Sequence, residues 1–270
     1  MTTSLNAQQQ QQLADYLKAL RLTSIRDQWT EVAQQAAQES LSYEQYLLEL
    51  VRHEWEMRQD RRIARLLRAS NLPYEKTLET FDLSRLPAQV LEAVTLMQQG
   101  FFLDKAENVL AFGNPGTGKT HLLCAVAQQL VRQGHRLWFT TCSLLVQHLL
   151  RAKRELTLGA YLKKLQTFEA IVIDDIGYVQ HDREEMEVLF TLLADRYERR
   201  SVMITSNLPF SKWDTIFKDP MTTAAAIDRV VHHSVILELN LPSYRMEEAQ
   251  KDSHGTRHEG EKSNSKDRNH

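Results

Sequence analysis

The chain has 270 residues, of which 42% are hydrophobic and 25% charged, and its formal net charge is −2. This is ordinary globular composition, and it excludes a protein that binds nucleic acid through overall positive charge, so any DNA contact must come from local patches. No stretch approaches the roughly 18 apolar residues of a membrane span, and the N-terminus lacks an apolar signal core, so we expect a cytoplasmic protein without a membrane partner. The two cysteines, Cys124 and Cys142, lack metal-ligand spacing and are expected to be buried thiols.

The first segment, residues 1–70, is expected to form a small all-helical domain that binds DNA or a partner protein. Residues 13–70 contain neither proline nor glycine, and their apolar residues recur at helical spacing. Ser42 and Gln45 have the spacing of a helix capping box. Prolines at positions 73 and 87 mark breaks, so residues 71–86 are expected to be a linker.

An arginine-rich face lies near the end of this helical segment. Residues 52–68 contain six arginines against three acidic residues. Helical spacing places five of the arginines on one broad face, which is a candidate contact for DNA or a partner protein: Arg58, Arg61, Arg62, Arg65 and Arg68. A solvated helix surface is the alternative interpretation.

From residue 87 to 246 the pattern is that of an α/β domain with a parallel sheet sandwiched by helices. Short apolar strands alternate with amphipathic helices, and the expected strands are 108–112, 137–140, 170–173, 201–205 and 235–239. Residues 247–270 carry five Lys/Arg and six Asp/Glu with almost no large apolar residue, so we expect a disordered tail.

Residues 113–120 have the form G-x-x-x-x-G-K-[ST] between an expected strand and an expected helix, the arrangement of a phosphate-binding loop. Backbone N–H groups of such a loop and the N-terminus of the helix favour anions. Lys119 is expected to reach the β- and γ-phosphates of ATP, and the Thr120 hydroxyl to bind Mg²⁺. The candidate cofactor-binding residues are Gly113, Asn114, Pro115, Gly116, Thr117, Gly118, Lys119, Thr120 and His121. A glycine-rich turn without a ligand is the alternative.

Two other strands end in polar residues at the sheet edge where such folds bind ligands. Asp174 and Asp175 follow an apolar run, and we expect Asp174 to hold Mg²⁺ and Asp175 to orient or deprotonate the attacking water. Asn207 follows the next strand and is expected to contact the γ-phosphate or that water. Each set of residues can also form a simple polar turn.

These motifs together resemble the AAA+ ATPases, a class of P-loop NTPases, and more closely the IstB-like helper ATPases of bacterial insertion sequences. The IstB-like proteins are in turn similar to the helicase loader DnaC and the initiator DnaA. The specific stretches are residues 174–178, 205–214, 227–234 and 243–245, and the resemblance covers about residues 10–246.

The resemblance implies roles for further residues. Arg229 matches an arginine finger, which reaches the γ-phosphate of a neighbouring subunit; a surface ion pair with Asp228 is the alternative. Arg245 resembles a second sensor arginine, although the family lacks the usual helical lid, and a helix-surface residue is equally consistent. Many AAA+ proteins have glutamate where this chain has Asp175, so hydrolysis is expected to be slow.

A second basic patch follows the second strand. By resemblance to the DnaA and DnaC group, its five cations would line a central channel and contact the DNA backbone: Arg151, Lys153, Arg154, Lys163 and Lys164. His232 and His233 are adjacent, so their side chains are expected to point apart, and no metal site beyond nucleotide Mg²⁺ is predicted.

The function predicted from the sequence is an ATP-dependent transposition helper that oligomerises on duplex DNA through ATP at subunit interfaces and recruits or activates a transposase. Hydrolysis of ATP would reset the assembly, with Lys119, Asp174, Asp175, Asn207 and Arg229 as catalytic residues. Three alternatives stay open: a replicative helicase loader, a small-molecule kinase, and a nucleotide-locked DNA scaffold that hardly turns over ATP.

Overall fold

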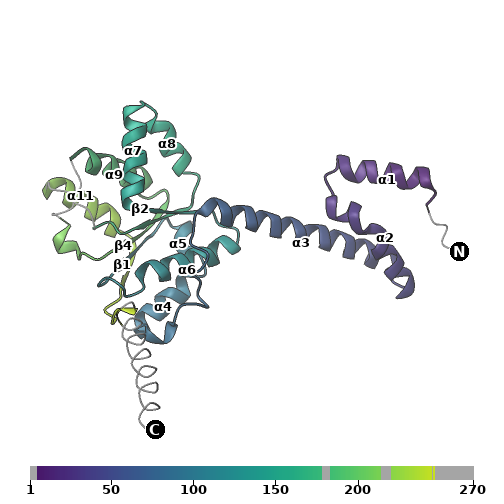
Figure 1. Cartoon of the computed structure of the whole chain (residues 1–270), viewed down its shortest axis with the longest axis horizontal. Helices are drawn as coiled ribbons and strands as arrows, with labels where there is room; N and C mark the ends of the chain where they lie inside the picture. Colours follow the sequence, from purple (N-terminus) through teal and green to yellow (C-terminus); the bar gives the residue numbers. More distant parts are fainter. Residues whose placement is uncertain (1–4, 178–182, 214–219, 245, 247–270) are drawn as a thin grey trace, which may run out of the picture. The chain divides into compact units, whose positions relative to one another are not determined.

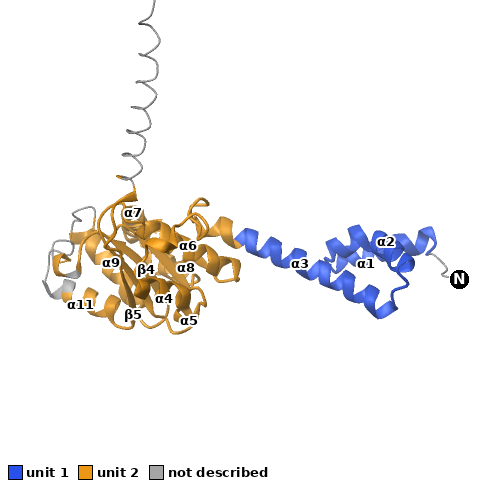
Figure 2. Cartoon of the chain, turned by 90° about the horizontal axis from the view of Figure 1, so that it is seen from below, with its two compact units in different colours: residues 1–65 blue, residues 66–270 orange. Residues whose placement is uncertain are grey.

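The computed structural model describes residues 5–177, 183–213, 220–244 and 246. Arg245 and the tail 247–270, both subjects of sequence predictions, lie outside the described residues. The chain divides into two compact units, Met1–Arg65 and Leu66–His270 (Figure 2). The unit boundary falls five residues before the domain end predicted at residue 70.

The first unit is helical. It contains α1 (Ala7–Ala19), α2 (Thr23–Gln38) and most of α3 (Tyr43–Ser70). Asn6 and Gln9 form a capping box at the start of α1. The predicted box at α3 is present, because the Ser42 N–H donates to Gln45 Oε1 at 2.9 Å and the Gln45 N–H donates to Ser42 Oγ at 3.3 Å.

The second unit is built on a five-stranded sheet in the order β2-β3-β4-β1-β5, with every neighbouring pair parallel. This confirms the predicted parallel sheet. The strands are β1 (Asn108–Phe112), β2 (Leu137–Thr141), β3 (Ala170–Asp174), β4 (Ser201–Ser206) and β5 (Ser234–Glu238).

Helices cover both faces of this sheet (Figure 1). The helices of the second unit are α4 (Ala88–Met97), α5 (Phe101–Asp104), α6 (Lys119–Arg132), α7 (Cys142–Arg154), α8 (Leu158–Leu165), α9 (Arg183–Arg196) and α11 (Pro220–Val231), with short 3₁₀ turns at Leu83–Arg85 and Phe210–Lys212. None of the helices among the described residues is both long and apolar enough to cross a bilayer.

Alternation of side chains along each strand divides the core into two layers. Val109 and Val172 point into the layer that α4, α5 and α6 complete, whereas Leu110 and Ile171 point into the layer of α7, α9 and α11. The layered arrangement holds the carboxyl ends of β1, β3 and β4 side by side, which is the edge that carries the predicted nucleotide residues.

The two cysteines are free and buried, as expected, and burial raises the pKa of each thiol to about 12. Such thiols remain protonated at neutral pH and behave as small apolar side chains.

Residues 71–86, predicted to be a linker, belong to the body of the second unit. Leu72 and Phe81 are only 5% and 6% exposed and join the core layer of α6. The Gln128 side chain on α6 donates hydrogen bonds to the carbonyls of Pro73 and Lys76, at 2.6 and 3.0 Å. The prolines at either end interrupt the helices, but buried side chains between them attach the segment to α6.

Candidate nucleotide-binding site

The phosphate loop connects the end of β1 to the start of α6. Gly118 is the residue before α6 and has a φ of 92°, and a Cβ there would lie 2.8 Å from the ring of Phe81, so glycine suits both the backbone and the space. Lys119 Nζ donates to the carbonyls of Gly113 and Asn114, each at 2.8 Å. The lysine therefore lies across the loop, with its ammonium group where phosphate oxygens would bind.

Asp174 is held at the end of β3 by two hydroxyl groups. Thr120 Oγ1, in the first turn of α6, donates to Asp174 Oδ1 at 2.6 Å, and Thr205 Oγ1, near the end of β4, donates to the same oxygen at 2.7 Å. The structure thus brings together Thr120 and Asp174, the two residues predicted to bind Mg²⁺. Hydroxyl and carboxylate oxygens are the hard ligands that Mg²⁺ prefers, so these residues fit the ion.

Thr205 also positions the second acid of the pair. The Asp175 backbone N–H donates to Thr205 Oγ1 at 2.8 Å, and Asp175 has a left-handed φ of 65°, which turns the chain sharply after the strand. Burial raises the pKa of Asp175, and the neighbouring Asp174 raises it further. A carboxylate with a raised pKa is a better proton acceptor, which suits the role predicted for Asp175.

The sequence analysis predicted a role for Asn207 but none for Thr205, two residues earlier. The sequence feature that could have indicated Thr205 is a β-branched hydroxyl residue near the end of a buried strand. That feature identifies a partner for Asp174 only once β3 and β4 are known to be neighbours.

Asn207 lies just after β4, and its Oδ1 is buried without a hydrogen-bond partner among the described residues. This oxygen is the acceptor that the predicted contact with the attacking water requires.

We expect Thr205→Val to lower the kcat of ATP hydrolysis by about 10- to 100-fold with little change in KM, because valine keeps the shape but removes both hydrogen bonds that orient Asp174 and Asp175. Steady-state kinetics checks this, and Thr205→Ser, which retains the hydroxyl, should recover most of the rate. A valine variant as active as the parent would show that the threonine does not position the acids.

A cleft of about 440 Å³ opens beside the loop. It is lined by Lys76, Thr80, Phe81, Gly116, Gly118, Lys119, Thr120, His121, Asp174 and Tyr244. Two residues of its aromatic wall, Phe81 and Tyr244, were not among the site residues predicted from the sequence. The Phe81 ring packs edge-on against His121, with centroids 5.2 Å apart, and lies 6.2 Å from the ring of Tyr244.

This wall is fixed by polar contacts. The guanidinium of Arg85 lies 3.7 Å from the centroid of the Tyr244 ring, and the Tyr244 N–H donates to the Gly116 carbonyl at 3.0 Å. His121 Nε2 lies 3.1 Å from the Thr77 carbonyl oxygen and 3.0 Å from Thr80 Oγ1. Burial lowers the pKa of His121, which favours the neutral imidazole. The cleft combines a cationic loop, which suits the phosphates of a nucleotide, with an aromatic surface, which suits its base.

Arg229 lies near the end of α11, away from the loop. The side-chain amide of Asn108, the first residue of β1, donates to the carbonyls of Arg229 and Val230 at 3.4 and 3.0 Å. The phosphate loop follows the opposite end of β1, which at about 3.3 Å per residue is roughly 13 Å away. The Arg229 guanidinium stacks over Phe190 at 4.7 Å, and its Nη1 is buried without a hydrogen-bond partner among the described residues.

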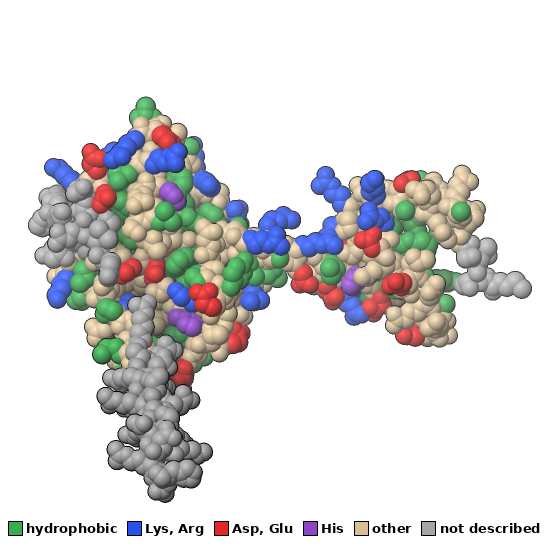
Figure 3. Space-filling model, in the orientation of Figure 1, with side chains coloured by type: hydrophobic (Ala, Val, Ile, Leu, Met, Phe, Trp, Pro, Cys, Tyr) green, Lys and Arg blue, Asp and Glu red, His purple; other side chains and the backbone are tan. Residues whose placement is uncertain are grey.

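The basic patch of α7 and α8 is partly neutralised within the chain. Arg151 pairs with Glu155 at 2.8 Å and Lys153 pairs with Glu187 at 3.0 Å, in both cases on the surface. Figure 3 shows Lys and Arg side chains with acidic neighbours in the region that α7 and α8 occupy. Arg154, Lys163 and Lys164 make no ion pair among the residues that the structure describes.

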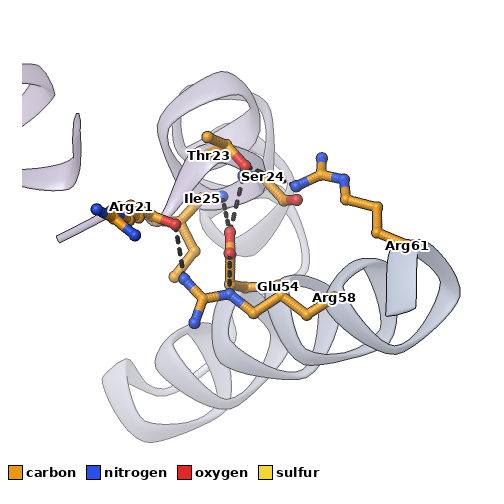
Figure 4. Close-up of polar contacts among 7 residues, drawn as sticks. All are labelled: Arg21, Thr23, Ser24, Ile25, Glu54, Arg58 and Arg61. Carbon is orange, nitrogen blue, oxygen red and sulfur yellow. Dashed lines mark hydrogen bonds and ion pairs between the residues drawn. The ribbon is translucent and has the colours of Figure 1, made fainter. Parts of the chain in front are cut away.

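The arginines of α3 fall into two groups. Arg58 Nε donates to Glu54 Oε1 at 2.7 Å and its Nη2 donates to the Arg21 carbonyl at 2.6 Å, while Arg61 Nη1 donates to Thr23 Oγ1 at 2.8 Å (Figure 4). These two arginines hold α3 against the start of α2. The others of the predicted DNA face are exposed and make no such contact within the described part of the chain: Arg62, Arg65 and Arg68.

Glu54 supplies the cap that α2 lacks locally. Leu22, which precedes α2, makes no side-chain capping bond, and Glu54 Oε2 accepts the backbone N–H groups of Ser24 and Ile25, at 2.7 and 3.2 Å. A carboxylate at a helix N-terminus satisfies free donors and interacts favourably with the helix dipole. Burial of Glu54 opposes ionisation, but hydrogen bonds from Arg58 and from these two N–H groups outweigh it and lower its pKa.

We expect Glu54→Gln to destabilise the first unit by about 1–3 kcal/mol, since the neutral amide leaves Arg58 without its charge partner. The stabilisation by Glu54 is complete above its ordinary pKa of 4.5 and is lost as pH falls through the lowered value. Hydrogen exchange of the α2 amides measures the effect at pH 7. Glu56→Gln, an exposed neighbour on the same helix, is the control, and equal protection in both variants would contradict the prediction.

Comparisons with known proteins identify the family of the chain. The family model of IstB-like ATP-binding proteins matches residues 15–252. An insertion sequence ATP-binding protein of Sinorhizobium fredii is 43% identical over 86% of this chain and 78% of its own length. The corresponding protein of insertion sequence IS21 from Pseudomonas aeruginosa is 35% identical over 87% of this chain and 89% of its own.

Solved structures show the same fold at low identity. DnaA from Aquifex aeolicus bound to AMPPCP has a TM-score of 0.54 at 17% identity, covering 64% of this chain and 52% of that one. A DnaC helicase loader has a TM-score of 0.52 at 19% identity, covering 61% of this chain and 97% of that one. The fold is therefore the one seen in DnaA and DnaC, and the sequence matches show that the chain belongs to the family of IstB-like ATP-binding proteins.

Proposed function

We propose that this protein is an ATP-hydrolysing transposition helper that assembles on duplex DNA and recruits or activates a transposase. The observation that carries the ATPase assignment is the contact of Thr120 and Thr205 with one oxygen of Asp174, beside the phosphate loop. The association with transposition is supported by the relatives, whose names place them in insertion sequences.

In this proposal each residue of the site has a separate task. Lys119 and the loop N–H groups bind the β- and γ-phosphates, and the aromatic wall of Phe81 and Tyr244 contacts the base. Thr120 and Asp174 would hold Mg²⁺, which would supply positive charge to neutralise the phosphates. Asp175 accepts a proton from the attacking water or orients it, and Asn207 Oδ1 accepts a hydrogen bond from the same water.

Assembly through ATP is the part of the proposal that Arg229 supports. Its backbone lies at the end of β1 opposite to the phosphate loop, remote from the nucleotide site of its own chain. A guanidinium so placed would donate to the γ-phosphate bound by the next subunit. Arg154, Lys163, Lys164 and the exposed arginines of α3 are the proposed DNA contacts, through phosphates and without reading of bases.

The proposal is tested by sedimentation of the purified protein with duplex DNA in the presence of a non-hydrolysable ATP analogue, of ADP, or of no nucleotide. We expect a discrete multi-subunit complex with the analogue and its loss with ADP. A protein that stays monomeric on DNA with every nucleotide would contradict the proposal. Co-sedimentation with an insertion-sequence transposase, against a replicative helicase, separates transposition from helicase loading.

A further inference from the structure

The turn after α9 and the turn between α11 and β5 bring three metal-binding side chains together on the surface, away from the nucleotide cleft. They are Glu198, His232 and His233, and their ligand atoms all lie within 4.8 Å of one another. We propose that these three residues bind a divalent transition metal ion of the Zn²⁺ type.

The geometry differs from the sequence prediction that the adjacent histidines point apart and form no metal site. Helix α11 ends at Val231, and His233 has a left-handed φ of 57°. The His233 side chain therefore does not point in the direction that a continued helix would give it. The two imidazole rings consequently have centroids 3.9 Å apart. Glu198, which also has a left-handed φ, of 56°, supplies the third ligand from a segment more than thirty residues earlier.

The backbone that carries these ligands is anchored on both sides. Arg196, two residues before Glu198, is buried and donates to the carbonyls of Leu165 and Ser201, each at 2.9 Å. The His233 carbonyl accepts the Asn108 N–H at 3.0 Å at the start of β1. Ligands on anchored turns lose little backbone freedom when an ion binds, which favours binding.

The chemistry of the cluster suits a borderline metal better than Mg²⁺. Two imidazoles and one carboxylate form a known zinc ligand set, with a fourth position open to water. Ligand atoms around tetrahedral zinc lie about 3.3 Å apart, so the side chains must rotate to close the site, and their exposure leaves room for that rotation. Tyr197 Oη lies 2.9 Å from His232 Nδ1, and this hydrogen bond restrains the ring and leaves Nε2 as the nitrogen available to a metal, as outer partners of zinc-binding histidines do.

The test uses the full-length protein without an affinity tag, stripped of metal and titrated with Zn²⁺ against a chromophoric chelator. Excess Mg²⁺ is present to occupy the oxygen ligands of the nucleotide site. We expect one site per chain. Glu198→Gln and His233→Asn should each weaken it by more than ~10-fold, and asparagine is chosen because it tolerates the left-handed backbone.

A double variant of two tail histidines, His254→Ala with His258→Ala, is the matched control and should bind Zn²⁺ like the parent protein. Zn²⁺ should also raise the Tm of the parent but not of His233→Asn, whose metal-free Tm shows whether it is folded. The proposal is overturned if the parent protein binds no Zn²⁺, or if binding survives both ligand substitutions and disappears in the tail variant.

Discussion

Lys119→Ala is expected to lower the kcat/KM for ATP hydrolysis by about 10³-fold or more. The ammonium group lies across the phosphate loop, within 2.8 Å of the Gly113 and Asn114 carbonyls, where it is placed to bind the phosphates of ATP in the ground state and the transition state. Alanine removes the positive charge and also the two hydrogen bonds to these carbonyls within the loop. The rate is measured with saturating duplex DNA, and nucleotide affinity by titration of a fluorescent ATP analogue.

Lys76→Ala is the matched control, because Lys76 lines the same cleft without belonging to the phosphate loop. We expect its effect to be below about 10-fold, as for a charge that only adds to the local potential. Comparable losses in the two variants would mean that the cleft acts through its overall positive charge, and that the loop lysine has no special role in hydrolysis.

The parts of the fold that local pattern determines were predictable from the sequence. The run that forms β3 is apolar throughout and ends at Asp174, so both the strand and the position of the acid followed from the residues themselves. The phosphate loop was equally clear, because its glycines, lysine and threonine have fixed spacing between a strand and a helix.

The parts that depend on long-range contacts were not predictable. Phe81 belongs to a segment bounded by prolines, and only its packing against His121 and the core beneath α6 makes residues 71–86 part of the site. Thr205 acquires its role because β3 and β4 are neighbours, and strand order is not encoded in any local pattern. Arg58 shared the helical spacing of a candidate DNA face, yet the buried carboxylate of Glu54 draws it into the packing of the first unit.

Arg229→Ala is expected to lower the ATPase rate measured with saturating duplex DNA by about 10³-fold or more while leaving the affinity of a single chain for ATP nearly unchanged. The arginine lies at the far end of β1 from its own phosphate loop, so under the proposed function it would contribute to catalysis only across a subunit boundary. Arg229→Lys keeps the charge and the contact with Phe190 but lacks the planar guanidinium group and its paired N–H donors. Its ATPase rate should therefore remain strongly reduced.

Mixing two inactive variants distinguishes this role from a structural one. In a mixed assembly, a Lys119→Ala subunit offers an intact Arg229 to the intact nucleotide site of an Arg229→Ala subunit, so some interfaces regain every catalytic group. ATPase activity of the mixture should therefore exceed the sum of the two separate proteins, and it should rise with the fraction of mixed interfaces. If Arg229 instead supports only the packing of α11 on α9, each subunit that lacks it stays defective whatever its neighbour supplies, and the mixture shows no gain.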